Sequence, residues 1–184
     1  MKTFTRIEPT DVYQVGGKFK RAVVVKRYRT DDGLEHEFTT MYDEGHQSAA
    51  VIALTPDNQV IISRQFRPGR ERYVDELPGG GVEDGETPEQ AARRELLEEA
   101  GYVPGALEFL GAYSWDAYNN LRGNYFFATN CTLSPEREKE QIEVDQGLET
   151  ALISIQTLLD NAVHDNMTDV AAVLMAYDRL RERL

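Results

Sequence analysis

A glycine-rich turn that leads directly into an acidic helix occupies residues 79–102, and this stretch constrains the chain most. Thr87 is a suitable helix N-cap, Pro88 suits the first helical position, and Gln90 completes a capping box with Thr87. Gly101 can adopt the left-handed conformation that ends many helices. The pattern therefore predicts a helix that starts at Pro88 and ends just before Gly101.

The predicted helix carries three carboxylates on one face, because Glu95, Glu98 and Glu99 are spaced i, i+3 and i+4. Like charges at this spacing repel one another, and a solvated acidic face is one interpretation of the run. The opposite face is apolar and can pack against a core. Clustered oxygen ligands without His or Cys suit Mg²⁺ or Mn²⁺ better than Zn²⁺. The spacing therefore favours a divalent-metal site, since a divalent cation relieves the repulsion.

Two other glycine motifs are excluded by their details. Gly80 and Gly85 have the spacing of a phosphate-binding P-loop, but Glu86 stands where the phosphate-binding lysine must be. The glycines at 79, 81 and 85 miss the dinucleotide-binding fingerprint by one residue, and the helix begins too late for a pyrophosphate to rest on it.

Residues 80–102 resemble the Nudix box, the signature of Nudix hydrolases, and match its fixed glycine and charged positions. Tyr102 departs from the pattern, since the family usually has an aliphatic residue there. The resemblance implies hydrolysis of a nucleoside diphosphate linked to another moiety, with Mg²⁺ as cofactor and Mn²⁺ as a substitute. It also implies Glu95 and Glu99 as principal metal ligands, Glu98 as a ligand or general base, and a backbone carbonyl near Gly79 as a further ligand.

The same resemblance implies a structural role for the other fixed positions of the box. Glu86 and Arg94 are expected to pair with each other and to shape the loop. The residues assigned to this structural group are Gly80, Glu86, Arg94 and Gly101.

Composition narrows the class of protein. At 184 residues the chain is long enough for one domain with a full core, and its net charge of −12 argues against a general nucleic-acid binder. No apolar run approaches the length needed to span a bilayer, and no secretory signal is recognisable. The single Cys131 cannot form an internal disulfide and is expected to be a small buried residue. These features favour a cytoplasmic protein without membrane contact.

Residues 1–47 are predicted to form a small antiparallel β-meander, because turn signals at Gly16-Gly17 and Asp31-Asp32-Gly33 bracket strand-like runs. The segment resembles the N-terminal sheet with which Nudix enzymes of the ADP-ribose pyrophosphatase type dimerise. A homodimer is therefore expected. The alternative is that the meander only caps the core sheet.

Residues 48–184 are predicted to form the Nudix domain. The continuous apolar runs at 49–54 and 60–66 indicate strands buried on both faces, and hence a sheet between helices. Further strands are expected at 107–113 and 123–129, and helices at 154–161 and 168–183. The fold class is α/β, an α/β/α sandwich with a mixed sheet.

Two short segments indicate a branch of the family. Gln65-Phe-Arg-Pro68 and Asp75-Glu-Leu-Pro-Gly79 resemble the corresponding segments of ADP-ribose and nucleoside-diphosphate-sugar hydrolases. That resemblance implies that Arg67 contacts the substrate and that Glu76 lies in the site. The alternative for Arg67 is a surface ion pair.

Residues beyond the box leave the branch open. ADP-ribose pyrophosphatases usually carry a Ser-Pro-Gly-like segment where this chain has Ala117, and Tyr118 resembles a tyrosine of some dinucleoside-polyphosphate hydrolases. Trp115 and Tyr118 are candidates for stacking on a base or sugar, although a lone tryptophan is more often a core or loop anchor. The acidic segment 134–146 resembles the loop that supplies a catalytic glutamate, with Glu140 as first candidate and Glu138 as second.

The sequence thus predicts a Mg²⁺-dependent hydrolase of ADP-ribose or a related nucleoside diphosphate sugar, a small nucleotide substrate. Glu98 or Glu140 would deprotonate the attacking water. Alternatives are a dinucleoside-polyphosphate or nucleoside-triphosphate hydrolase, a capped-RNA hydrolase, and a catalytically silent sensor domain. The sensor is disfavoured because every carboxylate of the box is present.

Overall fold

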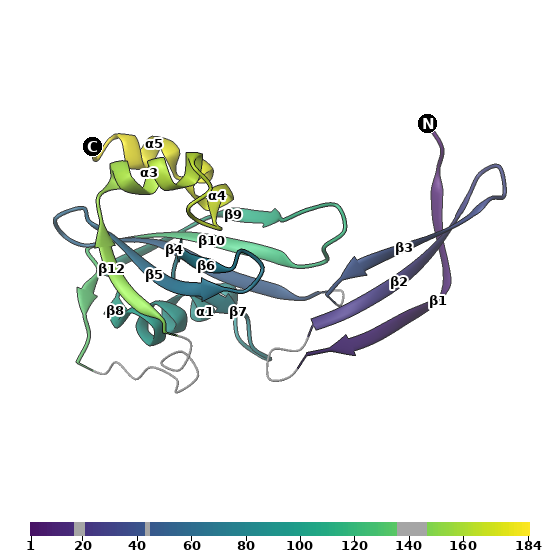
Figure 1. Cartoon of the computed structure of the whole chain (residues 1–184), viewed down its shortest axis with the longest axis horizontal. Coiled ribbons are helices and arrows are strands. Elements are labelled where there is room, and N and C mark those ends of the chain that lie inside the picture. The colour runs from purple at the N-terminus through teal and green to yellow at the C-terminus, as the bar shows by residue number, and fades with distance from the viewer. Residues whose placement is uncertain (17–20, 43–44, 136–146) are drawn as a thin grey trace. The chain divides into compact units, whose positions relative to one another are not determined.

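The computed structural model describes residues 1–16, 21–42, 45–135 and 147–184 (Figure 1). The chain forms two compact units. Unit 1 comprises Met1–Gln47 and Ser114–Arg122, and unit 2 comprises Ser48–Tyr113 and Gly123–Leu184. The sequence had assigned residues 114–122 to the domain that begins at residue 48.

Unit 1 is an antiparallel sheet of three strands in the order β1-β2-β3. The strands are β1 (Phe4–Val15), β2 (Arg21–Thr30) and β3 (Glu35–Met41). Segment 114–122 belongs to this unit because Met41 N–H donates to the Tyr118 carbonyl and Asn120 N–H donates to the Met41 carbonyl, each at 2.8 Å. The strands lie where the predicted meander places them.

Unit 2 is built on a seven-stranded sheet in which β12, β5, β4, β10 and β9 are neighbours in that order. Strand β6 pairs with β5, and β7 pairs with β4. A separate pair joins β8 (Tyr102–Val103) to β11 (Thr132–Leu133). The seven strands are β4 (Gln47–Leu54), β5 (Val60–Arg67), β6 (Arg72–Glu76), β7 (Gly79–Gly81), β9 (Ala106–Ser114), β10 (Arg122–Thr129) and β12 (Glu149–Ile153).

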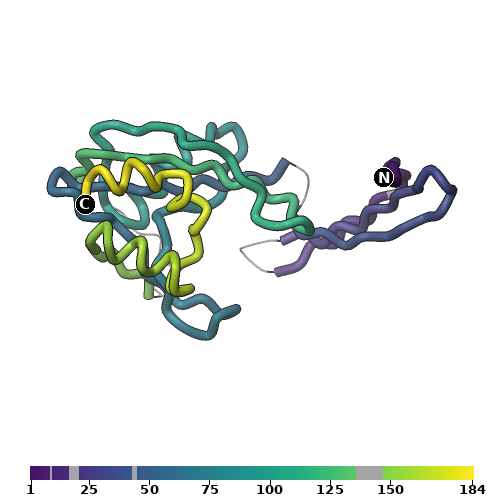
Figure 2. Tube along the Cα trace, turned by 90° about the horizontal axis from the view of Figure 1, so that it is seen from above, coloured from purple at the N-terminus to yellow at the C-terminus, as the bar shows by residue number. Residues whose placement is uncertain are grey.

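Helices cover both faces of this sheet. The C-terminal helices α3 (Ile155–Val163), α4 (Val170–Met175) and α5 (Tyr177–Arg181) lie on one face, and α1 (Pro88–Glu95) lies on the other (Figure 1). Figure 2 shows the C-terminal helices, in yellow and yellow-green, from above. The predicted helix over 168–183 is interrupted at Ala176, which separates α4 from α5. Among the described residues, no helix is both long enough and apolar enough to cross a bilayer.

The two faces of the sheet have different cores. On the α3–α5 side, large side chains such as Ile52, Ile62 and Leu158 fill the space. On the α1 side many of the buried residues are alanines, including Ala49, Ala53, Ala91, Ala92 and Ala100. Small side chains at a helix–sheet contact let the two backbones approach closely. The acidic helix is therefore held close to β4, β5 and β7.

Candidate active site

The acidic helix begins as the sequence predicts. Thr87 Oγ1 accepts from the backbone N–H of Gln90 at 3.2 Å, and the Gln90 side chain accepts from the Thr87 N–H at 2.8 Å. Its last turn differs from the prediction, because residues Leu96–Ala100 form a π-helical turn that ends at left-handed Gly101. Such single π turns are rare and are found frequently at functional sites.

The carboxylate of Glu99 is buried against the backbone of the glycine turn. Its Oε2 atom accepts hydrogen bonds from Ser63 Oγ and from the backbone N–H of Gly79, both at 3.0 Å. Thr150 on β12 donates to the Glu99 carbonyl at 3.1 Å and so fixes the backbone of the same turn. Glu99 is thus tied to three strands of the sheet, β5, β7 and β12.

The carboxylate of Glu95 is also buried, and it lies against Gly80. A Cβ atom added at Gly80 would be 2.2 Å from Glu95 Oε1 and 3.0 Å from Oε2. Only a residue without a side chain allows the carboxylate to lie this close to the backbone. Gly79 and Gly80 therefore form the floor on which Glu95 and Glu99 converge.

Arg94 connects the carboxylates to the loop before the helix. Its Nε and Nη2 atoms donate to the two oxygens of Glu86 at 3.0 and 3.1 Å, and Nη2 also donates to the Gly81 carbonyl at 2.9 Å. Its Nη1 atom donates to Glu95 at 2.8 Å and to Glu98 at 3.1 Å. The bonds to Glu86, which have the largest effect, and those to Glu95 and Glu98 raise the pKa of Arg94. The bond from Arg94 in turn lowers the pKa of Glu86. The expected Glu86–Arg94 pair is present.

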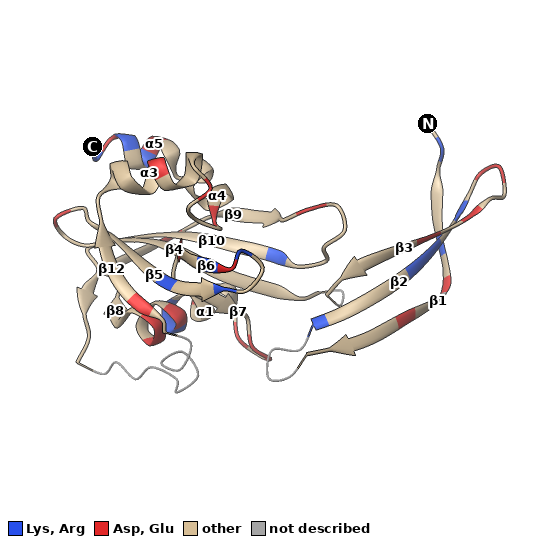
Figure 3. Cartoon of the chain, in the orientation of Figure 1, with Lys and Arg blue, Asp and Glu red and all other residues tan. Residues whose placement is uncertain are grey.

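The donor set suits a hard divalent cation. Two buried carboxylates, Glu95 and Glu99, face one glycine turn, and Glu98 is the more exposed third. Figure 3 shows acidic and basic positions next to one another on the ribbon of this helix. Oxygen-only donors of this kind favour Mg²⁺ or Mn²⁺. Within the described ranges no three His, Cys, Asp or Glu side chains are already arranged around a common point. We call Glu95, Glu98, Glu99 and the backbone of Gly79 and Gly80 the carboxylate cradle. The cradle therefore fits a metal that takes further ligands from water or from a phosphate.

Strand β5 adds a row of polar side chains next to this cradle. Ser63, Gln65 and Arg67 alternate along the strand, so they point to the same face. Glu76 on β6 lies in register with Ser63 and is buried. Gln65 donates to Glu76 Oε2 at 3.1 Å, while Arg67 donates through Nε at 2.9 Å to both oxygens and through Nη2 to Oε2. Arg67 and Glu76, both predicted site residues, are thus bound to each other.

Three of these polar residues, Ser63, Gln65 and Thr168, were not identified from the sequence. Thr168 precedes α4 and donates to Glu76 Oε1 at 3.2 Å. The alternation of polar residues at 63, 65 and 67 was an available signal, since a strand with one polar face has this period. Nothing local marks Thr168, because its partner lies 92 positions away.

The remaining predicted residues lie elsewhere. Trp115 and Tyr118 are exposed in unit 1, where Tyr118 helps to line a hollow of about 370 Å³. Asn120 stabilises that wall by donating to Thr40 Oγ1 at 3.0 Å and accepting from Lys26 Nζ at 2.7 Å. Glu138 and Glu140 fall outside the described residues. The hollow is lined by Phe4, Lys26, Tyr28, Phe38, Thr40, Ala117, Tyr118 and Asn120.

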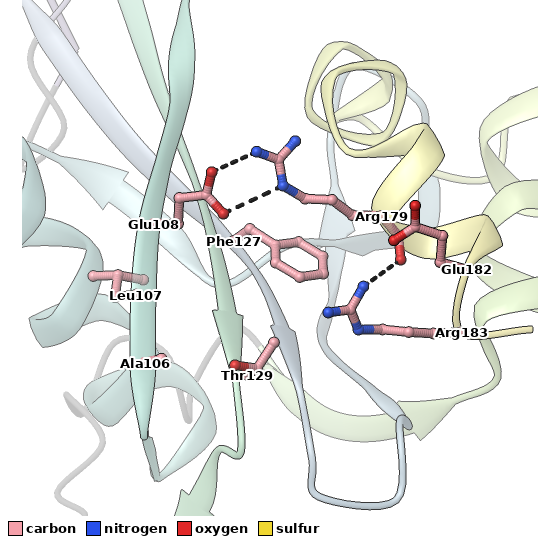
Figure 4. A pocket seen from close by; sticks show the side chains of 8 residues that line it. All are labelled: Ala106, Leu107, Glu108, Phe127, Thr129, Arg179, Glu182 and Arg183. Carbon is pink, nitrogen blue, oxygen red and sulfur yellow. Dashed lines mark hydrogen bonds and ion pairs between the residues drawn. The ribbon is translucent and has the colours of Figure 1, made fainter.

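A second hollow, of about 230 Å³, lies between β9, β10 and α5 and shares no residue with the carboxylate cradle (Figure 4). Its cations already have partners: Arg179 is paired with Glu108, and Arg183 lies over the ring of Phe127 and donates to the Arg179 carbonyl at 2.6 Å. We assign no ligand to it.

Comparison with known proteins agrees with the site. The chain is 32% identical over 142 residues to an ADP-ribose pyrophosphatase of Bacillus subtilis, covering 74% of each chain. It is 43% identical over 58 residues to an 8-oxo-dGTP diphosphatase of Escherichia coli, which covers 32% of this chain and 45% of that protein.

The fold also has a solved counterpart. A crystal structure described as an ADP compounds hydrolase superposes with a TM-score of 0.75 at 20% identity, covering 98% of this chain and 95% of the other. The predicted Nudix-type α/β/α sandwich with a mixed sheet is therefore confirmed. Members of the Nudix family act on small nucleotides and use divalent metal ions. The NUDIX domain model matches residues 45–171, and the chain belongs to the Nudix family as a pyrophosphohydrolase.

Proposed function

We propose that the chain hydrolyses the pyrophosphate bond of ADP-ribose or a related nucleoside diphosphate sugar, with Mg²⁺ as cofactor. The products are a nucleoside monophosphate and a sugar phosphate. The observation that carries the proposal is the arrangement of Arg67 and Glu76 on the polar face of β5 and β6, which also bears Ser63, the partner of Glu99. The similarity to the B. subtilis ADP-ribose pyrophosphatase, which extends over most of both chains, supports the same substrate class.

The roles of the cradle residues follow from their burial and partners. Glu95 and Glu99 would hold Mg²⁺ with the Gly79 carbonyl and Glu98, and the bound ion would offset negative charge on the pyrophosphate. Glu99 needs an orienting partner for this role, and Ser63 and the Gly79 N–H supply it. Arg94 offsets the repulsion between Glu95 and Glu98 by donating a hydrogen bond to each of them.

The general base is proposed among Glu98, Glu140 and Glu138. Glu98 is the most exposed of the three carboxylates Glu95, Glu98 and Glu99, with 34% of its side chain accessible, so water can reach it. The Nη1 atom of Arg94 donates to Glu98 and also to Glu95, so it can keep its bond to Glu95 when Glu98 takes a proton. One of these glutamates would take a proton from the attacking water. The water oxygen would then bond to a phosphorus of the pyrophosphate while the bond from that phosphorus to the bridging oxygen breaks, which releases the two phosphate products.

Arg67 is proposed to bind the substrate. It donates to Glu76 through Nε and Nη2, and 42% of its side chain is exposed, whereas Glu76 is buried. A guanidinium fixed on one side by a carboxylate presents its outer N–H groups in a defined direction, which suits a phosphate or sugar hydroxyl.

Unit 1 is proposed to contribute aromatic contacts and a dimer interface. Trp115 and Tyr118 are exposed and are candidates for stacking on a base or sugar. The β1 strand exposes Phe4, Val12 and Tyr13, an apolar surface that suits a second copy of the chain. A monomer at high micromolar concentration in sedimentation would refute the dimer. The cytoplasmic location stays a prediction.

The substrate is tested with a panel of ADP-ribose, nucleoside diphosphate sugars, diadenosine polyphosphates and 8-oxo-dGTP, each with Mg²⁺. The expected result is that the wild type prefers diphosphate-linked sugars. Glu99→Gln should lose this turnover, and Arg67→Ala should mainly raise the KM. Turnover confined to dinucleoside polyphosphates or triphosphates would overturn the proposed substrate, and turnover of none would favour the sensor. Exposed Arg21→Ala serves as the matched control for Arg67→Ala.

A further inference from the structure

A short segment before α4 runs beside the outer edge of β6. The backbone N–H of Asp75 donates to the Asn166 carbonyl at 3.1 Å, and Asp75 forms a parallel bridge with Met167. The next two residues, Thr168 and Asp169, are thereby placed beside the end of β6. They connect the C-terminal helices to the strand that carries Glu76.

The hydroxyl of Thr168 lies between two carboxylates. Its oxygen is 3.2 Å from Glu76 Oε1 and 3.0 Å from Asp169 Oδ2. Asp169 Oδ2 also accepts from the backbone N–H of Leu77 at 3.2 Å. Both carboxylates are buried, with 6% of Glu76 and 8% of Asp169 exposed. Because a hydroxyl has a single hydrogen, it can donate to only one of them at a time.

A proton on Asp169 removes this competition. Protonated Asp169 donates to the Thr168 oxygen, and the Thr168 hydrogen is then directed at Glu76, so all three groups are satisfied. The charged groups that face Asp169 within the described structure are Glu76 from β6 and Arg67 from β5. Burial, reinforced by Glu76, raises the pKa of Asp169 to about 6 against the opposing effects of Leu77, Thr168 and Arg67. Asp169 therefore gains or loses its proton near pH 6.

We propose that Thr168 and Asp169 are positioning residues that direct the Glu76 carboxylate and, through it, the Arg67 guanidinium. They do not touch the substrate. Glu76 receives side-chain donors from Gln65, Arg67 and Thr168, and Thr168 alone among these comes from outside β5. This inference rests on the proposed role of Arg67 in binding the substrate. It adds that the start of α4 determines how well Arg67 is aimed.

The first test is Thr168→Val, which removes the hydroxyl and keeps the branched shape. Loss of one hydrogen bond that orients a binding residue predicts a KM for ADP-ribose raised by roughly 3- to 10-fold, with kcat nearly unchanged. Thr168→Ser, which restores a hydroxyl, should recover most of the lost affinity. Thr132→Val on exposed β11 is the matched control. A KM for Thr168→Val equal to that of the wild type at pH 5.5, where Asp169 is protonated, would overturn the inference.

The pH dependence separates positioning from a general loss of structure. The KM ratio of Thr168→Val to wild type should be larger at pH 5.5 than at pH 8, because the hydroxyl is directed at Glu76 when Asp169 is protonated. Taking a ratio cancels effects of pH on metal and substrate that both proteins share. In Asp169→Asn the amide can donate to Thr168 at every pH, so this ratio should not change with pH. If the KM ratio of Thr168→Val to wild type, both with Asp169 present, is the same at pH 5.5 and pH 8, the role of Asp169 is overturned.

A second readout does not depend on turnover and so separates this inference from the proposed function. The ¹H–¹⁵N signal of Arg67 Nε, assigned by its absence in Arg67→Lys, should shift in Thr168→Val. It should titrate near pH 6 in the wild type and not in Asp169→Asn. If the protein hydrolyses none of the panel, the proposed function fails while these shifts still support the coupling. An unchanged Arg67 signal overturns the coupling, even in an enzyme that hydrolyses ADP-ribose.

Discussion

Replacing Gly80 by alanine should displace one carboxylate of the cradle without unfolding the protein. The new Cβ would lie 2.2 Å from Glu95 Oε1, whereas ordinary contact begins at 3.4 Å, so the carboxylate must move by about 1 Å. The atom in the way is the end of a flexible side chain, and the backbone can stay in place. Misplacement of a reacting or ligand group by this amount costs roughly 100-fold in rate. We therefore expect kcat/KM to fall about 100-fold.

The neighbouring glycines provide matched controls. A Cβ at Gly81 meets nothing within 4 Å, so Gly81→Ala should keep its activity within a few-fold of the wild type. A Cβ at Gly79 would lie 2.5 Å from the backbone oxygen of Ala49, so Gly79→Ala must open the β4–β7 pairing and should lower stability by roughly 1–3 kcal/mol or more. The three variants separate the site from the fold.

The assay is phosphate release from ADP-ribose together with thermal unfolding, each with Mg²⁺ and with a chelator. Wild type and Gly81→Ala should gain thermal stability from Mg²⁺, because an ion that binds only the folded state stabilises it. Gly80→Ala should keep its chelated unfolding temperature and lose most of that gain. Full activity in Gly80→Ala, or unfolding as severe as in Gly79→Ala, would refute the inference that the missing side chain at Gly80 makes room for the Glu95 carboxylate.

Three further changes test other parts of the structure. Arg94→Lys should lower the unfolding free energy by about 2 kcal/mol in urea titrations, because lysine cannot reproduce the forked pair of bonds to Glu86 together with the bond to Glu95. The contribution of Asp169 makes the unfolding free energy of the wild type fall as pH rises from about 4 to about 6, and Asp169→Asn should lack this fall. The folded wild type binds that proton more tightly than the unfolded chain, so it loses up to about 3 kcal/mol as pH rises from 3.8 through about 6, and an equal pH profile in the variant would contradict this. Burial raises the pKa of Cys131 to about 11, so a thiol reagent at pH 8 should react only after denaturant is added, and rapid reaction of the native protein would contradict the burial.

Local patterns predicted the acidic helix well. Its capping box and its glycine stop depend on residues within one or two turns of each other, so Thr87, Gln90 and Gly101 sufficed. The strands 49–54 and 60–66 were equally clear because their apolar runs are continuous. The π turn at Leu96–Ala100 was not predicted, since Glu99 is drawn to Ser63 and Gly79 by contacts that exist only in the folded chain.

Contacts between distant segments limited the prediction of the site. Ser63 lies 36 positions from Glu99, and Thr168 lies 92 positions from Glu76. The first contact depends on how the π turn packs against β5, and the second depends on the path of the chain after α3; periodicity encodes neither. Arg67 and Glu76 were found only because short segments around them resemble a known family. The sequence offered an ion pair for Arg67 as the alternative to substrate contact, but it did not identify Glu76 as the partner.

The charge balance of the site explains why its parts are so interdependent. Glu95, Glu98 and Glu99 repel one another, and Arg94 together with the donors from Ser63 and Gly79 offsets that repulsion. The alanine-lined contact with the sheet brings the helix close enough for those donors to reach the carboxylates. The same closeness leaves no room for a side chain at Gly80. Close packing, glycine and a cationic partner therefore act together: the close contact brings donors to the carboxylates, Gly80 leaves room for Glu95, and Arg94 supplies positive charge beside them.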